Sequence, residues 1–208
     1  MMHLVCLDME GVLIPEIWKA VAEKTGIDAF LKTTRDEPSY DVLMTERLEI
    51  LKREKINLSV FHEVVEDLEP LPGAVEFMEW AKSQTRVVVL SDTFEQFIHP
   101  IMRKLGFPTI FCHTLELAPD GTFENYHLRL DDQKRKAVKA FQALNFRVFA
   151  AGDSHNDETM LESADTAALY GPCDTMVEKF PQLPVLQDHK QLRKFLETEF
   201  LGEPVGKA

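Results

Sequence analysis

Two carboxylates, Asp8 and Glu10, stand one residue apart where the apolar segment LVCL ends and the chain reaches Gly11. Alternate side chains of an extended segment point to the same side, so both carboxylates would face one site. Adjacent carboxylates repel unless a cation or a proton lies between them. One of them could therefore bind magnesium and act as a nucleophile while the other carries a proton. The alternative is a helix N-cap, which explains one acid well and two poorly.

Two later apolar segments also end in polar residues. These residues are Ser91 and Asp92 after VVVL, and Asp153, Asn156 and Asp157 after FAAG. A helix is expected to begin at about Asp92 or Thr93, so the Ser91 hydroxyl and nearby backbone N–H groups could bind a phosphate. Helix capping explains any one of these groups. Because ligands of open α/β sheets bind at the carboxyl ends of the strands, three such ends together favour a site with a hard, oxygen-seeking cation.

Lys134, in LDDQKRKAVKAF, is a candidate phosphate ligand. If Asp131 or Asp132 caps the helix, Lys134 lies in its first turn, where the helix dipole disfavours a cation. A bound phosphate and a neighbouring aspartate would relieve that. Arg135 and Lys136 compete with it, and a solvated basic face would explain any of the three.

Arg47 falls within an apolar helical stripe made of Leu43, Met44, Leu48 and Leu51. A guanidinium on an inward, apolar face usually has an anionic partner, and either a substrate carboxylate or a structural salt bridge would serve. Glu16 could pair with a substrate ammonium, or it could be an acid that suits the first turn of a helix.

The elements that must position these residues follow from the hydrophobic pattern. Apolar segments rich in β-branched residues recur at 3–7, 86–90, 109–113, 146–152 and 166–171, and most are separated by segments of helical periodicity. This alternation predicts an α/β fold with a parallel, Rossmann-like sheet. Asp120-Gly121, between alternating apolar and polar residues, predicts a hairpin within 113–130.

The first two apolar segments are much further apart than one crossover helix requires. Helical patterns at 15–26, 40–54 and 58–69 fill the interval. We therefore expect a small helical cap domain over residues 14–72, and an α/β catalytic core over residues 1–13 and 73–208.

Composition excludes several functional classes. The 208 residues carry a formal net charge of -12, which disfavours nonspecific binding to nucleic acid or to an anionic membrane. We find no membrane-spanning segment and no secretion signal, and we expect a cytoplasmic protein. The cysteines, Cys6, Cys112 and Cys173, suit reduced thiols. His113, His127 and His155 lack zinc-ligand spacing, and the absence of a Gly-rich nucleotide loop argues against an ordinary kinase.

Taken in order, LDMEGV, LSDT, Lys134 and GDSHND resemble the four motifs of the haloacid dehalogenase-like phosphohydrolases, over residues 3 to 170. The helical insert after the first motif, together with ERLEILK and its Arg47, looks like the phosphoserine phosphatase branch. Glu10 in the second acid position, followed by GVLIPEIW, is similar to bacterial members that transfer a phosphoryl group from phosphoserine to homoserine. The family's usual acid there is aspartate, followed two residues later by threonine, where this chain has Val12.

The resemblance implies a haloacid dehalogenase-type core and a magnesium-dependent phosphatase for O-phospho-L-serine that could also phosphorylate L-homoserine. The catalytic residues it implies are the nucleophile Asp8, the proton donor and acceptor Glu10, and the phosphate ligands Ser91 and Lys134. The substrate would contact Ser91, Asp92, Lys134 and Asn156, with Glu16 and Arg47 at its amino-acid part. Magnesium would be held by Asp8, the Glu10 carbonyl, Asp153 and Asp157.

Other functions stay open at this point. The chain could hydrolyse another small phosphomonoester, act as a phospho-accepting signalling module, or be a silent scaffold. The large insert after the first strand argues against a signalling receiver domain. The expected partners are small molecules, phosphoserine and homoserine, and a homodimer is compatible with the sequence.

Overall fold

The computed structural model describes residues 2–34, 36, 37 and 39–202, and within them one sheet has the order β4-β3-β2-β1-β5-β6-β7. The strands are β1 (Met2–Leu7), β2 (Arg86–Phe94), β3 (Thr109–Leu117), β4 (Phe123–His127), β5 (Phe146–Gly152), β6 (Thr166–Tyr170) and β7 (Val185–Leu186). Neighbouring strands are parallel except β3 and β4, which are antiparallel. The predicted α/β fold with a mostly parallel sheet is confirmed.

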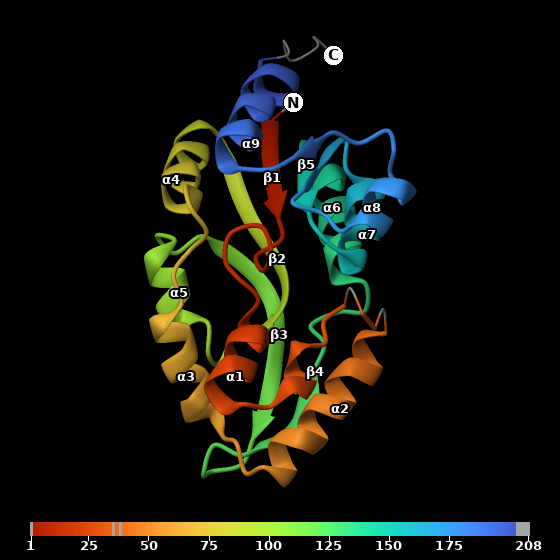
Figure 1. Ribbon diagram of the computed structural model, residues 1–208. Coiled ribbons are helices and arrows are strands. Elements are labelled where there is room, and N and C mark those ends of the chain that lie inside the picture. The colour runs from red at the N-terminus through yellow and green to blue at the C-terminus, as the bar shows by residue number, and fades with distance from the viewer. Residues whose placement is uncertain (1, 35, 38, 203–208) are drawn as a thin grey trace.

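Helices cover both faces of the sheet (Figure 1). Val5 and Leu7 of β1 belong to a hydrophobic cluster shared with α4 (Ala74–Gln84), α5 (His99–Lys104) and α9 (His189–Phe195). Leu4 and Cys6 belong to a second cluster, shared with α6 (Gln133–Ala143), α7 (Glu158–Ser163) and α8 (Asp174–Lys179). Because β1 lies between β2 and β5 and is covered on both sides, its sequence is apolar without alternation.

Residues 14–72, called here the helical insert, come between β1 and α4, and their described part lies beyond the carboxyl ends of the central strands (Figure 1). It contains α1 (Ile17–Thr25), the short 3₁₀ helix η1 (Asp28–Leu31), α2 (Tyr40–Arg53) and α3 (Leu58–Asp67). The three expected helices are present, and η1 was not expected. The division of the chain into a core and a cap domain stays a prediction, and residues 35, 38 and 203–208 of its ranges lie outside the described residues.

The predicted hairpin is confirmed as β3 and β4, and it extends to contact the helical insert. Gly121 forms its turn with a φ of 82°, which favours glycine, and the Gly121 carbonyl accepts a hydrogen bond from Leu58 N at 3.0 Å. Asn57 forms an isolated bridge with Thr122. The turn therefore joins the start of α3 to the sheet.

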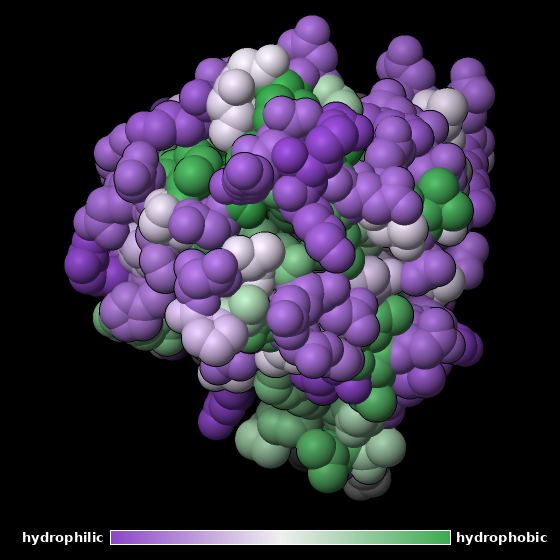
Figure 2. Space-filling model, turned by 90° about the horizontal axis from the view of Figure 1, so that it is seen from below, coloured by the Kyte–Doolittle hydropathy of each residue, from purple (hydrophilic) through white to green (hydrophobic). Residues whose placement is uncertain are grey.

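Viewed from the end that carries the helical insert, the surface is mostly hydrophilic, with hydrophobic residues gathered chiefly at one edge (Figure 2).

One prediction about the second core strand is wrong. β2 does not end at Ser91 but continues to Phe94, and the next helix, α5, begins at His99 and not at about Asp92 or Thr93. Phe94 and Phe97 are buried, and Phe94 pairs with His113 of β3, so the extended path places two aromatic rings in the core. A helix from Asp92 would lose this pairing. Within the described residues, no helix is long and apolar enough to cross a membrane.

Candidate active site

Three buried carboxylates meet where β1 and β5 end. Oxygen atoms of Asp8, Asp153 and Asp157 all lie within 4.8 Å of one another. Lys134 lies among them, with its Nζ 2.9 Å from Asp8 Oδ1 and 2.7 Å from Asp157 Oδ1. The parallel arrangement brings these residues to one edge of the sheet, although the chain separates them widely.

The structure distinguishes Lys134 from its two competitors. Lys134 occupies the first turn of α6 and is only 2% exposed, whereas Arg135 is exposed and pairs with Asp132. Lys136 is also exposed, and its Nζ lies 3.8 Å from Asp131. Of these three cations, only Lys134 reaches the carboxylates.

The charges of this cluster are strongly coupled. Burial raises the pKa of Asp8 well above its usual range, and Asp157 and Asp153 raise it further, while Lys134 lowers it. Burial alone lowers the pKa of Lys134, but Asp157, Asp8 and Asp92 outweigh that effect and raise it. A charged lysine among three carboxylates leaves an excess of negative charge. An oxygen-only donor set of this kind fits a hard divalent cation such as Mg²⁺.

Asp157 differs from the other two carboxylates in its contacts. Its Oδ1 accepts from Lys134, and its Oδ2 accepts from the backbone N–H groups of Asp153 and Ser154 at 2.9 and 3.2 Å. Both oxygens are therefore already engaged. This geometry suits a residue that orients Lys134 and the Asp153 loop.

Two glycines allow the loops of this cluster to approach closely. A Cβ on Gly11, whose φ is 81°, would lie 2.5 Å from Asp153 Oδ2. A Cβ on Gly152 would lie 2.3 Å from Asp157 Cγ. Any side chain at either position would have to displace a carboxylate of the cluster.

Glu10 faces the same pocket as Asp8. Its Oε2 accepts a hydrogen bond from Ile17 N, at the start of α1, at 2.9 Å. Burial and the neighbouring Glu16 carboxylate raise the pKa of Glu10 to about 8. Near neutral pH the Glu10 carboxyl therefore holds a proton that it can donate.

Arg47 forms the opposite wall of this pocket, in the helical insert. It is 4% exposed, its guanidinium lies 4.1 Å from the centre of the Trp18 ring, and its Nη2 donates to Lys32 O at 2.9 Å. Its Nε is buried and has no hydrogen-bond partner among the described residues. Glu16 also lines the pocket, and it sits at the N-cap of α1 without making a side-chain capping hydrogen bond.

Ser91, Asp92 and Asn156 complete the pocket from the side of the sheet. Asp92 Oδ2 accepts from Asn156 Nδ2 at 2.8 Å, and Asp92 Oδ1 accepts from Gln133 Nε2 at 3.1 Å and lies 3.2 Å from His113 Nε2. Burial by itself raises the pKa of Asp92, but Lys134, His113 and Asn156 together hold it well below its usual range. Asp92 is thus an ionised side chain beside the buried Ser91.

Sequence reasoning missed several residues of this site. Tyr40, Trp18 and Thr34 line the pocket from the insert, and His113 and Gln133 support Asp92 from β3 and α6. Trp18 stands in GVLIPEIW, but none of these residues was given a role in the site. Tyr40 lies at a helix start that reads as an ordinary boundary, and His113 was considered only as a zinc ligand.

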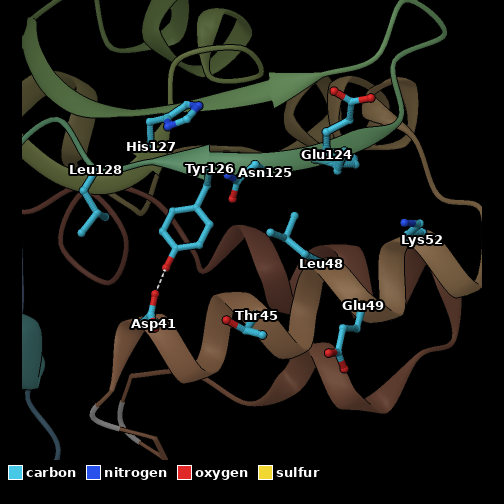
Figure 3. Close-up of a pocket in the computed structure, with 11 residues that line it drawn as sticks. Asp41, Thr45, Leu48, Glu49, Lys52, Glu124, Asn125, Tyr126, His127 and Leu128 are labelled. Carbon is cyan, nitrogen blue, oxygen red and sulfur yellow. Dashed lines mark hydrogen bonds between the residues drawn. The ribbon is translucent and has the colours of Figure 1, made fainter.

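Cavity size alone would point elsewhere. A groove of about 600 Å³ lies between α2 and β4, where Leu48 and Thr45 face Asn125 and Tyr126 donates a hydrogen bond to Asp41 (Figure 3). The Asp8 pocket holds only about 50 Å³. The groove has no buried carboxylate and lysine cluster in the described part of the chain. Chemistry, not volume, therefore selects the Asp8 pocket.

A parallel α/β sheet with a helical insert after β1, and an aspartate and lysine at its carboxyl edge, defines a hydrolase of the haloacid dehalogenase-like class. Residues 2–162 match the haloacid dehalogenase-like hydrolase family, and the chain belongs to it. This membership favours an enzyme over a signalling receiver module.

The chain is 50% identical over 198 residues to phosphoserine phosphatase ThrH of Pseudomonas aeruginosa, covering 95% of this chain and 97% of that protein. It is 48% identical over 192 residues to a phosphoserine phosphatase of Pseudomonas syringae pv. tomato, covering 92% of this chain and 81% of that protein. A crystal structure of phosphoserine phosphatase from T. onnurineus superposes with a TM-score of 0.74 at 25% identity, over 95% of this chain and 96% of that one.

Proposed function

We propose that the protein is a magnesium-dependent phosphoserine phosphatase that works through an aspartyl-phosphate on Asp8 and also transfers the phosphoryl group to L-homoserine. The observation that carries this proposal is Arg47, which lines the same pocket as Asp8, and whose buried Nε has no hydrogen-bond partner among the described residues. One pocket thus offers a nucleophile for a phosphate and a donor for a carboxylate. The names of the two Pseudomonas relatives support the same substrate.

In the first half-reaction, a carboxylate oxygen of Asp8 attacks phosphorus in line with the serine oxygen. Lys134 and the Ser91 hydroxyl stabilise the charge on the transferring phosphoryl group. Glu10 donates its proton to the departing serine oxygen, which the pKa of about 8 permits near neutral pH. The products are L-serine and an aspartyl-phosphate.

In the second half-reaction, ionised Glu10 removes a proton from water or from the hydroxyl of homoserine, which attacks the aspartyl-phosphate. Asp8 leaves and is regenerated, with phosphate or phosphohomoserine as the product. Asp8, the Glu10 carbonyl and Asp153 are the proposed ligands of magnesium, with Asp157 supporting them. The metal, when bound, would neutralise phosphate charge and raise the electrophilicity of phosphorus.

Recognition of the amino-acid part is assigned to the helical insert. Arg47 would donate to the substrate carboxylate through Nε, and Glu16 would accept from the ammonium group. At about 50 Å³ the pocket is too small for phosphoserine, so on this proposal the insert moves away from the core to admit the substrate. On this proposal residues 14–72 form a cap over a core of residues 1–13 and 73–208.

The deciding experiment incubates the enzyme with O-phospho-L-serine and Mg²⁺, with and without L-homoserine, and follows serine, phosphate and phosphohomoserine together. We expect serine release in both cases and phosphohomoserine only with homoserine. An Asp8→Asn variant should release no serine. Serine release without any phosphohomoserine would contradict the transfer activity and leave the phosphatase, whereas no release from phosphoserine would contradict the proposal as a whole.

An Arg47→Met variant tests the substrate assignment with a built-in control. We expect KM for phosphoserine to rise about 10- to 100-fold, because a charged hydrogen bond to the carboxylate is lost. Acetyl phosphate has no amino-acid part, so its KM should change by less than about threefold on the same reasoning. Equal effects on both compounds would contradict a carboxylate-binding role.

A further inference from the structure

Two hydrogen bonds connect the helical insert to the core at the Asp8 pocket. One is made to Asp92 directly, and the other is made to Asn156, which is itself hydrogen-bonded to Asp92. The Tyr40 hydroxyl, at the start of α2, donates to the Asp92 carbonyl oxygen at 2.7 Å. The Thr34 hydroxyl lies 3.4 Å from Asn156 Oδ1 and donates to it, and the Nδ2 of the same amide donates to Asp92 Oδ2 at 2.8 Å. Asp92 is thus the residue of the sheet on which both contacts depend.

Two aromatic rings of the β3–β4 hairpin pack against the ring of Tyr40. Its centre lies 5.7 Å from the His113 ring and 6.0 Å from the Tyr126 ring, both in edge-on contacts. Tyr126 in turn donates to Asp41, the next residue of α2, so the hairpin supports this end of the helix (Figure 3). The Tyr40 hydroxyl is therefore aimed at Asp92 by contacts that do not involve the substrate pocket.

Tyr40 also forms part of a partition between two cavities. With Asp92 and Asn156, it lines both the Asp8 pocket and a neighbouring cavity of about 160 Å³ bordered by Leu130 and Asp131. Separation of Tyr40 from Asp92 would open the Asp8 pocket to this second cavity. Water could then reach the reacting atoms from the side of β3.

The core holds Asp92 in the orientation that this contact requires. Arg129 N donates to His113 Nδ1 at 3.1 Å, so the ring proton of neutral His113 is on Nε2, which faces Asp92 Oδ1. The ionised Asp92 then fixes the Asn156 amide, because the flipped amide would place an oxygen against the carboxylate. Asn156 Oδ1 is thereby left to accept from the Ser154 hydroxyl at 2.6 Å and from the Thr34 hydroxyl at 3.4 Å.

We propose that Tyr40 is a positioning residue that latches the helical insert onto Asp92, with Thr34 as a second latch through Asn156, and that this latch excludes water from the aspartyl-phosphate. The water-exclusion part rests on the proposed function, whereas the latch itself is a property of the free protein. Closure brings the pocket wall that carries Arg47 against the core. Because bulk water is then excluded, the hydroxyl group of the acceptor is the favoured nucleophile.

The first test measures the latch without substrate. The chain has two tryptophans, so a Trp80→Phe background leaves Trp18, which lies in the insert at the pocket wall, as the single tryptophan, excited selectively at wavelengths where tyrosine does not absorb. We expect Tyr40→Phe to increase the opening equilibrium about 2- to 12-fold, as the loss of one neutral hydrogen bond predicts, and so to increase acrylamide quenching of Trp18. Thr34→Val should act in the same direction, and Thr34→Ser should restore the original quenching.

Thr25→Val is the matched control, because the Thr25 hydroxyl also makes a 2.7 Å hydrogen bond in the insert, but to Val21 O within α1. It should leave Trp18 quenching at the value of the Trp80→Phe parent. Unchanged quenching in both Tyr40→Phe and Thr34→Val, with folding verified by circular dichroism, would overturn the latch.

The second test measures what the latch does in turnover. At a fixed homoserine concentration, Tyr40→Phe should raise the ratio of phosphate to phosphohomoserine by the same factor as the opening equilibrium. An unchanged ratio in a variant whose Trp18 quenching has risen would overturn the water-exclusion role. If the parent enzyme releases no serine from phosphoserine, the proposed function fails, and the quenching results still decide the latch.

Discussion

Lys134 Nζ lies 2.9 Å from Asp8 Oδ1, and this contact joins the start of α6 to the end of β1 in the buried part of the protein. The same Nζ lies 2.7 Å from Asp157. The lysine therefore reduces the repulsion between the Asp8 and Asp157 carboxylates, and it lowers the pKa of Asp8, which burial raises. It favours the ionised form of Asp8, the form that could attack a phosphate, and so opposes the burial that raises the Asp8 pKa.

Replacement of Lys134 by methionine should lower kcat/KM for phosphoserine by about 100- to 1000-fold, because one preorganised positive donor to the phosphoryl group is lost. Lys136→Met removes a neighbouring charge from an exposed side chain and is the matched control. Phosphate release measures both variants. A loss of less than tenfold in Lys134→Met would contradict the role given to this residue.

Glu10→Gln should affect substrates according to their leaving groups. Serine leaves as a basic alkoxide and needs a proton, so turnover of phosphoserine should fall about 100-fold or more. Acetyl phosphate releases a weakly basic carboxylate, so phosphorylation of Asp8 by acetyl phosphate should change far less. Rapid-quench measurement of the aspartyl-phosphate compares the two, and equal losses would contradict general-acid catalysis by Glu10.

The pH profile of the first half-reaction should reflect the same proton. Because the pKa of Glu10 is raised to about 8, its protonated fraction falls as pH rises through that value. Phosphorylation of Asp8 by phosphoserine should therefore slow above about pH 8, while phosphorylation by acetyl phosphate should not. Rapid-quench measurement of the aspartyl-phosphate at pH values from about 6 to about 9.5, between the ordinary pKa values of a carboxyl group and a lysine, distinguishes the two profiles.

Gly11→Ala should remove activity and destabilise the fold. The new Cβ would lie 2.5 Å from Asp153 Oδ2, and the φ of 81° disfavours any side chain. Gly26→Ala is the control, since Gly26 has a similar φ of 73° with nothing within 4 Å of a Cβ. It should lose only about 1–2 kcal/mol of unfolding free energy and keep its turnover. Equal turnover of the two variants would show that activity does not require the close approach of Gly11 to Asp153.

His189 should make stability depend on pH. Its Nε2 lies 2.9 Å from Val12 O, and its Nδ1 lies 3.0 Å from Pro72 O. These two carbonyls belong to the segments through which the chain enters and leaves the helical insert. Burial lowers the His189 pKa from its ordinary value of 6.5, although the two carbonyls, Asp188 and Glu76 oppose this. Between the folded pKa and 6.5 the unfolded chain binds more protons, so the unfolding free energy falls as pH falls through that window.

Urea unfolding at a series of pH values from about 8 to 5 measures this effect, around the ordinary histidine pKa. His189→Gln should have a smaller dependence of unfolding free energy on pH than the parent, whatever its stability at pH 8. Parallel curves for the two proteins would show that His189 is not the group responsible.

Local patterns were sufficient for most of the fold. Apolar segments predicted the strands, and Asp120-Gly121 predicted the hairpin turn, because both depend on short-range chemistry. The extension of β2 to Phe94 was missed because Ser91 and Asp92 are good helix caps, and only pairing with β3 overrides that preference. Local propensity cannot register such a tertiary contact.

For the site, the carboxylates were found because each follows an apolar strand. Tyr40 and His113 were not found, because their importance arises from contacts between β2, β3 and α2 that the linear sequence does not indicate. The division into core and cap, the homodimer and the roles of the site residues stay predictions. They depend on motion, assembly and reaction, which residue patterns do not report.

The central place of β1 in the sheet also bears on how the protein is made. Asp8 is synthesised long before Asp157, and β1 pairs with β2 and β5, which also follow it much later in the chain. The ribosome must therefore release most of the chain before Asp8 meets Lys134 and the neighbouring acids. Contacts of such long sequence separation form late and slow folding. In a nascent chain that stalls within the insert, the apolar strand β1 would be exposed, because β2 and β5, its two partners in the sheet, are not yet synthesised.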